Sequence, residues 1–171
     1  MTVYLRKVAG SDAKEFLTLM TTSQSLHKPW ISPPLDPRTF AAYLTRVSQP
    51  DHEGLLVCET KSEKIVGVVN INNIVRSSFL SASLGYYIGQ SYLGKGYMLE
   101  AMVQVRDYAF TTQGLHRLEA NIQPDNMRSI NLVKRSGFVY EGLSKNYLYL
   151  SGKWRDHERW ATYDARTSLS P

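Results

Sequence analysis

Cysteine and long apolar runs are nearly absent from this chain of 171 residues. Its one cysteine, Cys58, excludes an internal disulfide, and its place in the apolar run 55–58 predicts a buried thiol rather than a nucleophile. No apolar run is long enough to span a membrane. Residues 1–7 also lack the apolar region of a secretory signal. These absences predict a cytoplasmic protein that contacts no membrane.

The charge composition is ordinary for one globular domain, expected here over residues 1–171, with 20% charged and 43% hydrophobic residues. The net charge of +5 favours an acidic or phosphate-rich partner, such as a nucleotide-bearing ligand or a ribosome. A solvated basic surface explains the same charge, and nothing indicates sequence-specific binding of nucleic acid. His27, His116 and His157 are scattered without the spacing of metal ligands, so no metal is expected.

The most distinctive stretch runs from Gly89 to Met98, between an apolar run typical of a strand and a helical pattern that extends to Gly114. A strand that opens a helix through a turn leaves the first helical N–H groups unpaired, and the helix dipole adds positive potential there. Gly94 and Gly96 let a ligand approach the backbone closely. The stretch therefore resembles a binding site for phosphate groups.

Three phosphate-binding motifs compete for this stretch. Residues 89–95 match the start of a P-loop, but Gly96 stands where a magnesium-binding Ser or Thr is needed. Gly94 and Gly96 fit a dinucleotide fingerprint, but Leu99 replaces its third glycine and no repeated βαβ units follow. The third is a pyrophosphate loop, Gln/Arg-x-x-Gly-x-Gly/Ala, which residues 93–98 match fully only at Gly96. The loop alone does not separate these motifs from an ordinary strand-to-helix turn.

The periodicity along the chain predicts an α/β fold with a mixed sheet, because strands follow one another instead of alternating with helices as in a doubly wound domain. Asp12 with Glu15 predicts a capping box, and Asp36 before Pro37 predicts an N-cap, each opening a helix. The expected strands are 3–8, 55–60, 65–71, 83–88, 117–122, 138–141, 146–150, 153–155 and 158–163, and the expected helices are 13–20, 37–47, 98–114 and 127–136.

Motifs in the second half of the chain resemble the GNAT acetyltransferases. Residues 124–129 with 135–138 resemble their Asn-x-x-Ser … Gly-Phe segment, which ends in Gly-Phe-x-x-Glu-Gly at 137–142. Residues 146–149 with 152–157 resemble a motif near the C-terminus of one branch of this family, Tyr … Gly-x-Trp/Tyr-Arg-Asp-His. That branch is the RimJ/RimL-type ribosomal-protein alanine N-acetyltransferases. The likeness covers nearly the whole chain. It implies a single GNAT-type domain, with a mixed, mostly antiparallel sheet splayed at its centre and helices on both faces.

The resemblance implies acetyl-CoA as the acetyl donor and a primary amine as the acceptor. By this resemblance, the strand at 83–88 would contact the pantetheine of the cofactor. The backbone N–H groups from Gly94 to Met98 would contact its pyrophosphate. Asn126 matches a CoA-contacting asparagine and is equally suited to cap a helix. The residues implied to bind the cofactor are Tyr86, Tyr87, Ile88, Leu93, Gly94, Lys95, Gly96, Tyr97, Met98 and Asn126.

The resemblance also implies a catalytic role for Ser129, which stands where the family places a hydroxyl that serves the departing sulfur. A serine in a first helical turn is also common as a cap. Val133 replaces the tyrosine acid of many members, and Ser83 and Leu148 replace two carboxylate bases, while Glu141 is better explained as structural. A missing base favours an α-amine, with a pKa of about 7.7–8.0, over a lysine side chain at about 10.4.

The expected acceptor is therefore the N-terminal α-amine of a protein that begins with Ala or Ser, such as a ribosomal protein. Trp30, within a proline-rich loop, is expected either to wall the acceptor cleft or to cap the core. Three alternatives remain: an acetyltransferase for a small amine or antibiotic, a non-catalytic acyl-CoA sensor, and a basic protein that works through its ribosome-binding surface. A monomer and a homodimer both remain open.

Overall fold

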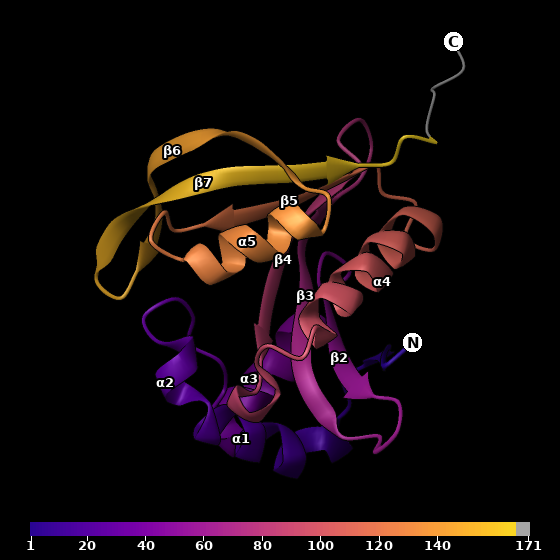
Figure 1. The fold of residues 1–171 in the computed structure, drawn as a ribbon, viewed down its shortest axis with the longest axis vertical. Helices are drawn as coiled ribbons and strands as arrows, with labels where there is room; N and C mark the ends of the chain where they lie inside the picture. Colours follow the sequence, from indigo (N-terminus) through magenta and orange to yellow (C-terminus); the bar gives the residue numbers. More distant parts are fainter. Residues whose placement is uncertain (167–171) are drawn as a thin grey trace.

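A computed structural model describes residues 1–166, which form a seven-stranded sheet with helices on both faces (Figure 1). The strand order is β1-β2-β3-β4-β5-β7-β6. The strands are β1 (Val3–Lys7), β2 (Glu53–Glu59), β3 (Ile65–Val75), β4 (Ser81–Ile88), β5 (Arg117–Ile122), β6 (Val139–Leu150) and β7 (Lys153–Tyr163). The helices are α1 (Ala13–Thr22), α2 (Gln24–His27), α3 (Pro37–Val47), α4 (Tyr97–Thr111) and α5 (Met127–Arg135), with 3₁₀ turns at Gly10–Asp12 and Gln90–Tyr92.

The sheet is interrupted between β4 and β5, which form its one parallel pair within the described residues. They pair over three positions, from Ser81 opposite Arg117 to Ser83 opposite Glu119. β4 then continues to Ile88 and β5 to Ile122 without further pairing between them. The two strands therefore diverge in the middle of the sheet. The predicted fold class, a mixed and mostly antiparallel sheet splayed at its centre, is confirmed.

Each face of the sheet buries its own apolar core. The larger core lies under α4 and α5 and includes Val105, Leu118 and Trp160. The smaller core lies under α1 and α3, where Phe16 and Phe40 pack over β2 and β3. Cys58 on β2 is fully buried there, as predicted, and burial raises the pKa of its thiol. Among the described residues, no helix is long and apolar enough to cross a membrane.

The last two strands differ from the predicted pattern. Four short strands were expected between 138 and 163, but the structure has two continuous ones, β6 and β7, joined by a turn at Ser151 and Gly152. Their register shifts between Tyr140 and Gly142 and again between Ser144 and Leu148. Such irregularities change which side chains point inward and which point outward, but they do not end the strand. The alternation in the sequence is therefore interrupted although each strand is continuous.

α1 begins at Ala13 as expected, but Asp12 and Glu15 do not form the capping box predicted there. The Asp12 carboxylate accepts hydrogen bonds from the Ala9 N–H at 2.8 Å and from the Arg6 guanidinium at 2.7 Å. The Glu15 carboxylate accepts from the Ile65 N–H at 2.7 Å. Both carboxylates therefore bind neighbouring segments and do not close a capping box. At α3 the predicted N-cap is confirmed, because Asp36 Oδ1 accepts from the N–H of the third helical residue at 2.9 Å.

Gly67 on β3 is packed against β4, and its substitution tests how tightly β4 is held. A Cβ at Gly67 would lie 2.8 Å from the Tyr87 carbonyl oxygen and 3.0 Å from Met98 Cε. We expect Gly67→Ala to lower the free energy of unfolding by about 1–3 kcal/mol, measured by urea denaturation. Gly10→Ala is the matched control, since its Cβ would meet only Leu44 at 4.0 Å. Equal stability of the two variants would contradict this packing.

Candidate active site

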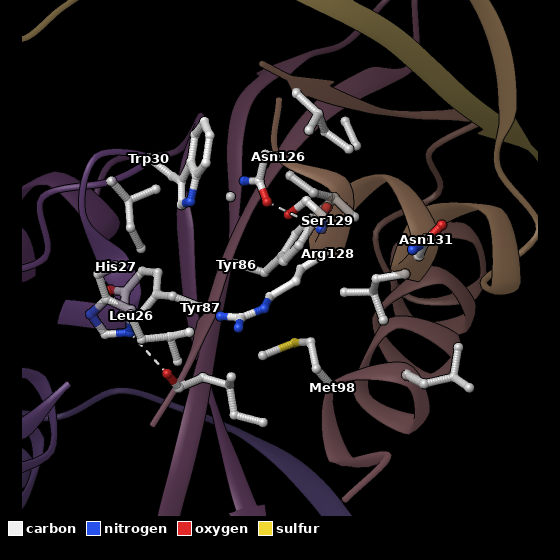
Figure 2. Close-up of a pocket in the computed structure, with 18 of the residues that line it drawn as sticks. Leu26, His27, Trp30, Tyr86, Tyr87, Met98, Asn126, Arg128, Ser129 and Asn131 are labelled. Carbon is white, nitrogen blue, oxygen red and sulfur yellow. Dashed lines mark hydrogen bonds between the residues drawn. The ribbon is translucent and has the colours of Figure 1, made fainter. Parts of the chain in front are cut away.

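A cavity of about 590 Å³ lies where β4 and β5 diverge. Its walls come from α2 and the loop that follows, from β4, β5 and β7, from the N-terminal end of α4, and from α5 along its length (Figure 2). Tyr86 and Tyr87 both line it, although the first packs against the core under α4 and α5 and the second against the core under α1 and α3. Because neighbouring residues of a strand point to opposite faces, the cavity is lined from both faces of the sheet.

The N-terminal end of α4 forms one wall. Gly94 and Gly96 have φ angles of 79° and 81°, in the left-handed region that favours glycine. Glu100 donates to the Gly96 carbonyl, but no described residue accepts from the N–H groups of Tyr97 and Met98. These unpaired donors and the dipole of a fifteen-residue helix favour an anion at this wall.

The charge of the lining is positive. Arg128 and Arg135 of α5 line the cavity, and none of the described residues that line it is an aspartate or glutamate. Figure 2 shows the Arg128 side chain extending from α5 into the cavity. Lys95 does not contribute its ammonium group, which lies 5.2 Å from the Tyr92 ring centroid, over the ring. The cavity is therefore suited to a ligand that carries phosphates and is unfavourable for a polycation.

The hydroxyl groups of Tyr86 and Ser129 lie near each other at the start of α5. The Ser129 N–H donates to Asn126 Oδ1 at 3.2 Å, so Asn126 is the N-cap of this helix. The Tyr86 hydroxyl is buried and has no hydrogen-bond partner among the described residues. Burial raises the pKa of Tyr86 to about 12, and the nearby Ser129 hydroxyl limits the rise without reaching hydrogen-bond geometry. Tyr86 therefore stays protonated, and both hydroxyls can donate to negative charge that develops beside them.

His27 of α2 holds the wall that faces α5. Its Nε2 lies 2.8 Å from the Ile88 carbonyl oxygen, shown as a dashed line in Figure 2. A carbonyl only accepts, so Nε2 carries the proton and Nδ1, which is buried and unpaired within the described chain, carries the lone pair. Burial lowers the pKa of His27. The neutral imidazole thus ties α2 to β4 and fixes the loop that carries Trp30.

The cavity brings together every residue predicted for the site except Lys95. These are Trp30, Tyr86, Tyr87, Ile88, Leu93, Gly94, Gly96, Tyr97, Met98, Asn126 and Ser129. Glu141 does not line it and is paired instead with Arg117. His27, Arg128, Arg135 and His157 line the cavity but were not predicted from the sequence, although Arg128, Arg135 and His157 stand inside the motifs described above. No three His, Cys, Asp or Glu side chains of residues 1–166 are grouped so that they could hold a metal ion.

Comparison with known proteins gives consistent similarities. An acetyltransferase (GNAT) domain model matches residues 2–139. The chain is 36% identical to the [ribosomal protein uS5]-alanine N-acetyltransferase of Escherichia coli K12, over 90% of this chain and 83% of that one. It is 28% identical to a spermidine N(1)-acetyltransferase of Vibrio cholerae, over 63% of this chain and 61% of that one. Mycobacterium smegmatis RimJ, solved in complex with CoA-disulfide, superposes with a TM-score of 0.87 at 27% identity, over 98% of this chain and 85% of that one.

Proposed function

The chain belongs to the GNAT family of acetyltransferases, and from this premise we propose that it acetylates the N-terminal α-amine of a protein that begins with Ala or Ser. It is an acetyl-CoA-dependent N-acetyltransferase, as the sequence motifs predicted. We also propose that residues 1–171 act as a single domain and that the cavity residues have the individual roles given below.

The cavity has groups that suit each part of acetyl-CoA. The unpaired N–H groups at the start of α4 suit the pyrophosphate, and Arg128 and Arg135 add positive charge. Beyond Ser83, the edge of β4 that faces β5 has no strand partner among residues 1–166, so its backbone can pair with the amide groups of pantetheine. The hydroxyls of Tyr86 and Ser129 are donors for the sulfur or the carbonyl of the thioester.

The observation that carries the choice of acceptor is the absence of carboxylates from the described lining of the cavity. A polyamine or an aminoglycoside carries several positive charges and would meet Arg128 and Arg135 with no carboxylate to offset them. A protein N-terminus presents one amine, which is already partly neutral at cellular pH because its pKa is about 7.7–8.0. The cavity therefore favours the α-amine.

The named activities of the relatives support the same choice. The relative at 36% identity is an alanine N-acetyltransferase for ribosomal protein uS5 and covers 90% of this chain, whereas the spermidine enzyme is 28% identical over 63%. The net charge of +5 also suits an enzyme that approaches a particle rich in RNA phosphates. A ribosomal protein is therefore the acceptor that we propose.

An acceptor assay tests this proposal. With acetyl-CoA, a synthetic peptide that begins with Ala and contains an internal lysine should be acetylated once, at its terminus, as read by mass spectrometry. Release of free thiol should match the product in amount. The rate should rise with pH until the α-amine has lost its proton, near about pH 8, because only the neutral amine attacks.

The controls are the same peptide with a blocked terminus and, separately, spermidine. Both should release no thiol above the rate without an acceptor. Faster acetylation of spermidine than of the free peptide would replace the proposed acceptor with a small amine. Stabilisation of the protein by acetyl-CoA with no turnover of any amine would instead support the non-catalytic sensor.

A further inference from the structure

The proposed reaction needs a group that takes a proton from the acceptor amine, and the cavity offers no carboxylate for it within the described residues. The two positions at which a base was expected hold Ser83 and Leu148. The titratable side chains of the lining that can act as bases near neutral pH are the imidazoles of His27 and His157. These two rings differ in which nitrogen is available.

His157 enters the cavity from the face of the sheet opposite Ser129. On β7, Arg159 is paired with Asn121 of β5, and Trp160 packs into the core under α4 and α5. Alternation along the strand therefore places His157 on the face of Arg159, away from α5. His157 is 2% exposed and lines the cavity. The proposed sulfur-side donor and this imidazole thus line the cavity from opposite faces of the sheet.

The hydrogen bonds of His157 define its protonation. Its Nδ1 lies 3.0 Å from the Arg155 carbonyl oxygen, which only accepts, so Nδ1 carries the proton. In the neutral ring Nε2 therefore has a free lone pair, and no described residue hydrogen bonds to it. Burial lowers the pKa of His157, which keeps the ring neutral at cellular pH, while the Arg155 carbonyl and Asp156 limit the fall. A neutral imidazole with an open Nε2 is ready to accept a proton.

His27 presents the reverse arrangement. Its Nε2 donates to the Ile88 carbonyl oxygen, and the lone pair on Nδ1 is sealed inside the protein with no partner from the described residues. Nε2 of His157 is not among the atoms sealed off in this way. Of the two histidines, His157 is therefore the one that can meet an amine in the cavity, directly or through one water.

From this geometry we infer that Nε2 of His157 is the general base that takes the proton of the acceptor amine, an inference that rests on the proposed function. The amine nitrogen forms a bond to the acyl carbon, and the bond from that carbon to sulfur breaks, leaving its electron pair on the sulfur. One amine proton passes to Nε2 of His157. The thiolate takes a proton from the Ser129 hydroxyl or from solvent, and both side chains then return to their starting state by exchange with water.

The surroundings of His157 determine how its titration is measured. On β7 the flanking residues are Asp156 and Glu158, of which Glu158 accepts a hydrogen bond from Trp160 at 2.9 Å, and Arg159 lies on the same face as His157. On β6 the Tyr147 ring lies 5.9 Å from the His157 ring. The Arg159 guanidinium lies over that Tyr147 ring, at 4.9 Å. Across the cavity, α5 contributes the arginines described above and α2 contributes the neutral His27. Asp156 is the negative group that raises the pKa of His157, so the fall caused by burial is opposed but not reversed.

His157→Asn, made in the full chain, separates the base from a structural role. The Asn amide can still donate to the Arg155 carbonyl, as Nδ1 does, but it cannot accept a proton. With acetyl-CoA and the Ala-first peptide, kcat/KM at pH 7 should fall by about 10- to 100-fold. This is less than the usual effect of a general base, about 100- to 10,000-fold, because the α-amine is already partly neutral. His52→Asn is the matched control, since His52 lies before β2 and outside the cavity lining, bonded to Asp51 at 2.9 Å.

The pH profile gives the sharper readout. A base works only when unprotonated, so activity is lost as the pH falls through the pKa of His157, which lies below its ordinary value of about 6.5. For the wild type and His52→Asn, log kcat/KM should rise with a slope of two below that pKa and a slope of one up to the pKa of the amine. For His157→Asn the slope should be one throughout. Added imidazole should partly restore His157→Ala.

Three results would overturn the inference. They are a wild-type slope that never exceeds one, full activity of His157→Asn, and a slope of two that survives in His157→Asn. Stabilisation by CoA shows that each variant is folded, and a wild-type slope that never exceeds one overturns the inference even where a variant does not fold. If the peptide is not an acceptor, the proposed acceptor fails, and the same profiles measured with the amine that is acetylated still test the base.

Discussion

Gly96→Asp is expected to weaken the binding of acetyl-CoA by about 100- to 1,000-fold while the protein remains folded. Gly96 has a φ of 81°, which Asp tolerates better than most residues, and a Cβ there would meet no atom of the described residues within 4 Å. The new carboxylate would lie at the N-terminus of α4, where the pyrophosphate is proposed to bind. Like charges about 4 Å apart at a partly screened site repel by up to about 4 kcal/mol, so affinity should fall by about 100- to 1,000-fold.

The measurement is the rise in Tm with increasing CoA, together with calorimetric titration. Gly96→Asn is the matched control, because it has the same shape and a similar tolerance of the left-handed region but no charge. We expect Gly96→Asn to lose less affinity than Gly96→Asp, and both to unfold cooperatively in the absence of ligand. If CoA stabilised Gly96→Asp as strongly as the wild type, the pyrophosphate would have to bind elsewhere.

The sequence predicted the order of strands and helices because each pattern is local. Apolar spacing along α4, the N-cap at Asp36 and the hairpin of β2 and β3 all depend on neighbours within a few residues. The failures have distant causes. Asp12 and Glu15 form a capping-box pattern, yet their carboxylates bind Arg6 and Ile65, which are brought close only by the folded sheet.

Local sequence patterns predicted the candidate site only where a single segment forms it, and the resemblance to the family supplied the other predicted residues. The turn at Gly94 and Gly96 and the cap at Asn126 could be inferred from the sequence, since backbone conformation and capping are properties of short segments. His157 could not, because its protonation depends on the Arg155 carbonyl and its position depends on which face of β7 borders the gap. A sequence that lacked the expected carboxylates was therefore interpreted as having no base, although an imidazole lines the cavity.

Ser129→Ala is expected to lower kcat by about 10- to 1,000-fold with little change in affinity for acetyl-CoA. The Ser129 N–H, not its hydroxyl, donates to the capping Asn126 at 3.2 Å, so the variant keeps the N-cap of α5. The hydroxyl is proposed to act when the sulfur gains charge, and a contact made only in the transition state changes kcat without changing ground-state binding. The assay is steady-state turnover of the Ala-first peptide beside calorimetric binding of CoA.

Tyr86→Phe distinguishes the two hydroxyls that meet at this point. Burial raises the pKa of Tyr86 to about 12, so its hydroxyl is also a protonated donor, and the nearby Ser129 hydroxyl is the polar group that limits the rise. If both donate to the same developing charge, the double variant should lose less than the product of the two single losses, because each single variant already weakens the shared contact. Multiplicative losses would mean that they serve different atoms. An unchanged kcat in Ser129→Ala, under conditions where chemistry limits turnover, would leave Ser129 as a residue of the first helical turn and Tyr86 as the donor.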